Sequence, residues 1–104
     1  MTATRQAHPL SESELKRTIV KMAVKQGWAV HETPQIKPRR PVKGQSNGYP
    51  DLTLARDEEV LFLEVKDQKG VQDIEQVRWM MALPRYEVIR PSDLARGRVD
   101  ELLA

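Results

Sequence analysis

Residues 48–66 read GYPDLTLARDEEVLFLEVK, and they combine two apolar runs with charged residues at the outer end of each. The first run begins directly after Asp51, and the second ends in Glu64 and Lys66. The polar residues 56–59 between the runs predict a turn, so the two runs should pair as a hairpin. Asp51, Glu64 and Lys66 then lie at the same end of this hairpin. The two-residue period of a strand places Glu64 and Lys66 on one face.

The second apolar run, residues 60–65, indicates the fold class. It is apolar at nearly every position, which is typical of a strand buried on both faces in the middle of a mixed sheet covered by helices. The whole chain therefore predicts an α/β protein with the order α-β-β-β-α-β-α. Further strands are expected over residues 28–32 and 86–89, and helices after Ser11, Asp73 and Pro91, the first ending at Gly27 and the second at Pro84.

Length and composition limit the classes of protein to consider. A chain of 104 residues fits one domain, which we place at residues 11–104 after a flexible arm over residues 1–10. It has 17 basic and 15 acidic residues, so the distribution of charge matters more than the net charge of +2. The absence of cysteine excludes disulfides and thiolate ligands, so any metal must be held mainly by oxygen. With no apolar run of about 20 residues, we expect no membrane partner and a cytoplasmic location, bacterial or, if the chain is viral, in the host cell.

The faces of the helices can be assigned from their sequences. Ser11 and Glu14 have the spacing of a capping box, which gives Glu14 a structural role. Glu12 lies three residues before Leu15, on the side expected to be buried, where a carboxylate needs a partner. Two interpretations of Glu12 stay open: a metal or water contact, or a favourable charge near the helix N-terminus. The apolar stripe of the second helix is expected at Ile74, Val77 and Met81.

A basic segment precedes the hairpin. Residues 33–50 contain four prolines and two glycines, and they include no acidic residue. A proline-rich connection of this length inside a small domain is usually functional or disordered. Because its positive charge comes directly before Asp51, we favour contacts with the phosphate backbone of a nucleic acid over a merely solvated charge run. The basic residues are Lys37, Arg39, Arg40 and Lys43.

The acids of the hairpin have the chemistry of a divalent metal site. Mg²⁺ and Mn²⁺ prefer oxygen ligands, which Asp51, Glu64 and the backbone carbonyl of Val65 can supply, with water and substrate phosphate completing the shell. Lys66 would orient the attacking water, lower its pKa or stabilise the charge that develops on the phosphate. The alternative is that Glu64 and Lys66 form only a surface ion pair at a strand end.

Several short motifs recur at family-like positions: GYPD at 48–51, EVK at 64–66, Gly70, Gln76 and the segment SESELKRTIV at 11–20. In these residues the chain resembles the VRR-NUC (virus-type replication-repair nuclease) family of the PD-(D/E)xK nuclease superfamily. The resemblance implies a restriction-endonuclease-like core and Mg²⁺- or Mn²⁺-dependent hydrolysis of structured or branched DNA, such as Holliday junctions, in replication, recombination or repair. It also implies a stand-alone, homodimeric form. It places Gln76 near the site, although from the sequence alone Gln76 could equally be an exposed helix residue. For the first helix, the resemblance implies that Glu12 is an acid of the site.

Two more residues are candidates for contact with DNA. Tyr49 either stacks against nucleic acid or simply packs, and Lys69 is a further candidate.

Two other functions also stay open. The chain could also be a DNA-binding module that keeps this fold without cutting, or a structural partner in a larger assembly in which the central acids only form ion pairs.

Overall fold

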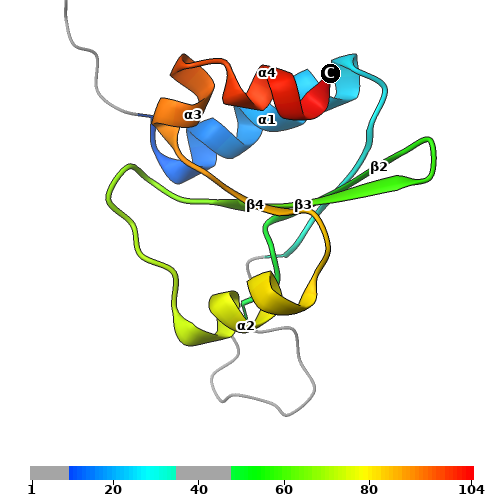
Figure 1. Ribbon diagram of the computed structural model, residues 1–104. Coiled ribbons are helices and arrows are strands. Elements are labelled where there is room, and N and C mark those ends of the chain that lie inside the picture. Colours follow the sequence, from blue (N-terminus) through cyan, green and yellow to red (C-terminus); the bar gives the residue numbers. More distant parts are fainter. Residues whose placement is uncertain (1–9, 35–47) are drawn as a thin grey trace, which may run out of the picture.

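The structure is a computed structural model that describes residues 10–34 and 48–104. Within these ranges the chain forms one sheet with helices on both of its faces (Figure 1). The elements are α1 (Glu12–Lys25), β1 (Ala29–Glu32), β2 (Leu52–Arg56), β3 (Glu59–Val65), α2 (Ile74–Ala82), β4 (Tyr86–Ile89), α3 (Pro91–Ala95) and α4 (Arg98–Leu103). None of the helices in these ranges has the length and apolarity needed to cross a membrane.

The sheet has four strands in the order β1-β2-β3-β4. The first two pairs of neighbours are antiparallel and β3 pairs with β4 in parallel, so the sheet is mixed. Helices α1, α3 and α4 lie on one face and α2 on the other (Figure 1). The prediction of an α/β protein with a mixed sheet between helices is therefore confirmed. The predicted chain order is wrong at its end, because two short helices follow β4 where one was expected. Gly97 separates them with a φ of 83°, a left-handed conformation that interrupts a helix.

The predicted hairpin forms, with a shorter turn than expected. Arg56 and Glu59 pair with each other as part of β2 and β3, which leaves only Asp57 and Glu58 in the turn. Both turn residues have positive φ, 50° and 68°, which matches the twist of the flanking strands. The register sets Leu52 opposite Leu63.

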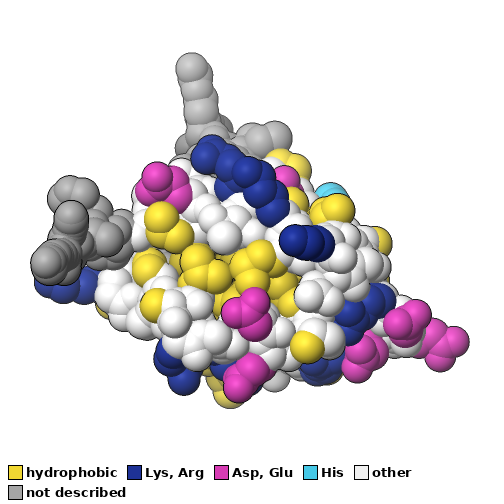
Figure 2. Space-filling model, turned by 90° about the horizontal axis from the view of Figure 1, so that it is seen from above, with side chains coloured by type: hydrophobic (Ala, Val, Ile, Leu, Met, Phe, Trp, Pro, Cys, Tyr) yellow, Lys and Arg dark blue, Asp and Glu magenta, His cyan; other side chains and the backbone are white. Residues whose placement is uncertain are grey.

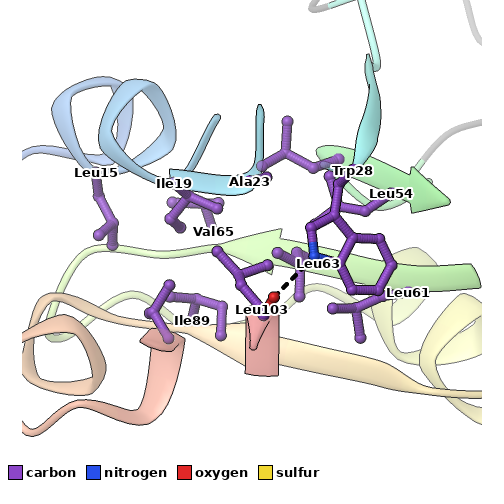
Figure 3. Close-up of a cluster of buried hydrophobic side chains, with 12 residues drawn as sticks. Leu15, Ile19, Ala23, Trp28, Leu54, Leu61, Leu63, Val65, Ile89 and Leu103 are labelled. Atoms are coloured by element: carbon purple, nitrogen blue, oxygen red, sulfur yellow. Dashed lines mark hydrogen bonds between the residues drawn. The ribbon is translucent and has the colours of Figure 1, made fainter. Parts of the chain in front are cut away.

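The hydrophobic core fills the space between the sheet and α1. Leu15, Ile19 and Ala23 of α1 are fully buried against the strands, and the indole Nε1 of Trp28 donates a hydrogen bond of 3.0 Å to the carbonyl of Leu103 (Figure 3). Ser11 caps α1 through the predicted capping box with Glu14, and these hydrogen bonds lower the pKa of Glu14. Looking down on this side, Figure 2 shows apolar side chains in the middle of the face with charged ones around them.

The predicted apolar stripe of α2 is wrong. Ile74 and Met81 are 71% and 81% exposed, and no residue of α2 is buried. The inward side instead carries Gln76, which bonds Glu64, and Trp79, whose ring contacts Tyr49. Residues three apart share a face of a helix, so these two contacts fix the rotation of α2 and turn the predicted stripe toward solvent.

Candidate functional site

The open end of the β2–β3 hairpin brings together the three residues expected there. Continuing the register by one step sets Asp51 opposite Glu64. The backbone N–H of Val65 donates to Oδ2 of Asp51 at 2.8 Å, and Nζ of Lys66 lies 3.7 Å from Oε2 of Glu64. The Glu64 and Lys66 side chains are 3% and 12% exposed, so the two groups are largely shielded from solvent and do not form the surface pair considered from the sequence.

The two oxygens of Glu64 have different surroundings. Oε2 accepts a hydrogen bond of 2.6 Å from Nε2 of Gln76. Oε1 is buried and receives no hydrogen bond from any residue that the structure describes. Burial, followed by the charge of the nearby Asp51, raises the pKa of the Glu64 carboxyl from 4.5 to about 8, against a smaller opposing effect of Lys66. A hydrogen bond between the protonated carboxyl and the Asp51 side chain adds to this rise. Near neutral pH, the site therefore favours either a proton or a cation beside these two acids.

The Gln76 amide is oriented by the N-terminus of α2. Its Oε1 accepts a hydrogen bond from the backbone N–H of Asp73, while Oδ1 of Asp73 accepts one from the backbone N–H of Gln76, both at 2.9 Å. This capping box leaves Nε2 of Gln76 to point at Glu64. The structure thus places Gln76 against the candidate site acid. The resemblance implied that Gln76 lies near the site, and in the structure its amide holds a carboxylate.

The chain entering the site passes close to α2 at Gly48. A Cβ atom on Gly48 would lie 2.6 Å from the carbonyl carbon of Glu75 and 2.7 Å from the backbone nitrogen of Gln76. Gly48 also has a φ of 78°, which a residue with a side chain rarely adopts. A glycine is needed here if both α2 and the segment before Asp51 are to keep their positions.

A cavity of about 430 Å³ opens between the first turn of α1 and the end of β3. Figure 1 shows the start of α1 above the point where the chain leaves β3. Glu12 is exposed, so the expectation that it lies on the buried side is wrong, but it lines the same cavity as Asp51. Its charge also acts on Glu64 by raising the pKa of that carboxyl. The lining residues are Ser11, Glu12, Ser13, Lys16, Asp51, Val65 and Asp67.

Three of these lining residues were not singled out from the sequence: Ser13, Lys16 and Asp67. One signal for Lys16 was available, because it follows Glu12 by four residues and so shares its side of α1. Ser13 and Asp67 carried no such signal, since their places depend on how α1 packs over the end of β3.

No three acidic or histidine side chains within residues 10–34 and 48–104 lie close enough together to hold a metal ion by themselves. A cation at this site would therefore take part of its coordination from elsewhere. Asp51 and Val65 line the cavity and can supply a carboxylate and a backbone carbonyl. Glu64 does not line it, but its carboxylate lies beside Asp51 and can supply a further oxygen. Water and a substrate oxygen would complete the shell, as is common for Mg²⁺.

The proposed nucleic-acid contacts are only partly covered by the structure. Tyr49 is half-buried, with its ring edge-on to Trp79 at 4.8 Å and to Phe62 at 6.3 Å between centroids, so it packs under α2. Lys69 is exposed and lines a neighbouring cavity with Asp67. The other four residues, Lys37, Arg39, Arg40 and Lys43, lie outside the described residues.

No protein-family model, no curated protein and no solved structure matches this chain.

Proposed function

We propose that this protein is a Mg²⁺- or Mn²⁺-dependent endonuclease with a restriction-endonuclease-like core that hydrolyses phosphodiester bonds in structured or branched DNA. The observation that carries the proposal is the buried Oε1 of Glu64: beside Asp51, the ionised carboxylate receives no hydrogen bond at this oxygen from the described residues. A buried carboxylate oxygen without a hydrogen-bond donor is costly when the group is ionised, and a second acid beside it increases the cost. A hard divalent cation removes both penalties.

The residues present fit such a cation. Asp51 and Glu64 would hold it together with the backbone carbonyl of Val65, and Glu12 would contact it through water from across the cavity. All of these ligands are oxygens, which suits Mg²⁺ and Mn²⁺. When bound, the cation would supply a Lewis acid for the phosphate and a more acidic water.

The chain's own side chains have separate tasks in this proposal. Gln76 donates to Oε2 of Glu64 and so fixes the carboxylate with Oε1 left for a ligand. The ammonium of Lys66, close to the same carboxylate, orients the attacking water or stabilises negative charge on the phosphate. Because Glu64 and Lys66 are almost excluded from solvent, charge–charge interactions are stronger there than in water.

The partner in this proposal is branched DNA bound by two copies of the chain. A symmetric junction offers two equivalent strands, and a two-fold dimer presents one site to each of them. Cutting of such structures belongs to replication, recombination or repair. A monomeric mass in light scattering with a bound four-way junction would contradict the dimer.

One assay separates cutting from binding. Purified protein is incubated with a labelled four-way junction, a flap and a linear duplex in Mg²⁺, Mn²⁺ or EDTA. We expect metal-dependent cleavage that disappears in Asp51→Ala and Lys66→Ala and persists in Lys21→Ala, which changes an exposed residue of α1. Tight binding without cutting in either metal would refute the enzyme and support a DNA-binding module.

The basic segment before the hairpin is tested by salt dependence. Arg39→Ala combined with Arg40→Ala should weaken DNA binding and flatten the plot of log K against log salt concentration, because each phosphate contact releases counterions. An unchanged slope would mean that these two residues do not touch phosphate.

A further inference from the structure

We propose that Lys16 is a substrate-binding residue that contacts a backbone phosphate of the DNA in the cavity beside Asp51, a role distinct from that of Lys66. This inference rests on the proposed function, since it names the side chain that meets the substrate at the same site. The inference is drawn from the residues that line the cavity and from the different contacts of Lys16 and Lys66.

Helix geometry directs Lys16 to the cavity. Lys16 follows Glu12 by one turn of α1, and residues four apart lie on the same side of a helix. Both line the cavity that also contains Asp51 and Val65. Leu15, next to Lys16 in the chain, is fully buried in the core, so the helix cannot rotate Lys16 away without exposing that side chain.

The charges that line the cavity favour a phosphate contact by Lys16. Its lining residues include three acids, Glu12, Asp51 and Asp67, and a single base, Lys16. A phosphodiester carries a negative charge and is repelled by such a lining even when a divalent cation neutralises the metal-binding acids. Lys16 is the one basic residue among the described residues that line the cavity, so it supplies the positive charge that attracts the phosphodiester.

The contacts of the two lysines divide their roles. Lys66 lies 3.7 Å from Oε2 of Glu64, so its ammonium belongs to the buried carboxylate. Lys16 forms no ion pair or hydrogen bond with any residue in the described ranges. It is half-buried at the cavity wall, and its long, flexible side chain ends in a compact charge suited to a phosphate oxygen. The hydroxyl of Ser13 lines the same cavity and offers a second donor.

The test compares Lys16→Gln with Lys21→Gln in the full chain. Lys21 is an exposed lysine of the same helix that does not line the cavity. Binding of a labelled four-way junction is measured by fluorescence anisotropy over a series of salt concentrations. Ca²⁺ replaces Mg²⁺ in this assay to suppress hydrolysis while the affinity is measured. Binding of the metal alone is measured by calorimetry.

Lys16→Gln should raise Kd roughly 5- to 20-fold at low salt and reduce the slope of log K against log salt by about 1, the value for one phosphate contact. Lys21→Gln should leave both near the wild-type values, and Lys16→Arg should restore the slope. Metal binding should be unchanged or tighter in Lys16→Gln, because a positive charge near the ligands has been removed.

Equal slopes for Lys16→Gln and wild type would overturn the assignment, as would a loss of metal binding that accounts for the weaker affinity. Each of these outcomes can be distinguished from the result expected if the protein is not a nuclease. A wild-type protein that binds the junction and never cuts it with Mg²⁺ or Mn²⁺ refutes the enzyme, while the slopes still decide the role of Lys16. A wild-type protein that binds no DNA refutes both.

Discussion

Replacing Glu64 by glutamine is expected to change how the stability of the metal-free protein depends on pH. The variant keeps the shape of the side chain and an oxygen that can accept the hydrogen bond from Gln76, but it removes the titrating carboxyl. In the wild type, burial and the neighbouring Asp51 raise the pKa of Glu64 from 4.5 to about 8. The unfolded chain exposes this carboxyl to water, where its pKa returns to the ordinary value.

The direction and size of the change in stability with pH follow from the difference between the pKa of Glu64 in the folded and in the unfolded chain. Between about pH 4.5 and pH 8 the folded protein binds the Glu64 proton more tightly than the unfolded chain does. The contribution of protonated Glu64 to stability is therefore complete below about pH 4.5 and is lost as pH rises through about 8. The loss amounts to about 1.4 kcal/mol for each pH unit inside this window, and to roughly 4 to 5 kcal/mol across all of it.

Urea unfolding followed by circular dichroism in EDTA at pH 5, 6, 7, 8 and 9 measures this effect. Other acids titrate in both proteins, so the informative quantity is the unfolding free energy of the wild type minus that of Glu64→Gln. This difference should fall by up to about 1.4 kcal/mol per pH unit as pH rises from 5, and it should level off as pH passes about 8. Glu32→Gln, at an exposed position of β1, serves as the control and should run parallel to the wild type. A difference between wild type and Glu64→Gln that does not vary with pH would refute the argument about Glu64.

Added Mn²⁺ should reverse the loss. The cation requires the ionised carboxylate, so it should stabilise the wild type more at pH 8 than at pH 6. At a metal concentration of about 100 times Kd the gain is roughly 2.7 kcal/mol. Glu64→Gln should gain much less at either pH. Equal gains in the two proteins would show that Mn²⁺ binds elsewhere.

Three other predictions concern the framework around the site. Leu63→Ala removes a fully buried side chain and should cost about 3 kcal/mol in urea unfolding, the usual size for an unfilled core cavity. Gly48→Ala forces a Cβ atom to 2.7 Å from the backbone nitrogen of Gln76. This change should lower the free energy of unfolding in urea by roughly 1–3 kcal/mol, and it should shift the pKa of Glu64 in an NMR titration. Glu58→Gly relieves a φ of 68° in the hairpin turn and should raise the melting temperature by a few degrees, whereas the same change at the exposed strand residue Glu32 should lower it.

The local pattern of the sequence was enough to predict a mixed sheet between helices and the meeting of Asp51, Glu64 and Lys66. A tight turn sets two strands side by side, so the residue before the first strand and the residues at the end of the second strand must lie close together. The two-residue period of a strand then decides which of these side chains share a face. The capping box of Ser11 was predictable for the same reason, because its hydrogen bonds span only three residues. These features depend on neighbours in the chain, and a single sequence contains that information.

Features that depend on packing between distant segments were not predictable in this way. The rotation of α2, which leaves Ile74 and Met81 exposed, follows from contacts with Tyr49 and Glu64 that the periodicity of the helix does not contain. The placing of Lys16 beside the site acids likewise depends on how α1 lies over the end of β3. Burial of Glu64 is the most important of these effects, because water is excluded only once the sheet and helices have assembled. That exclusion raises the pKa of the carboxyl and turns an ordinary Glu-x-Lys pair into a candidate site.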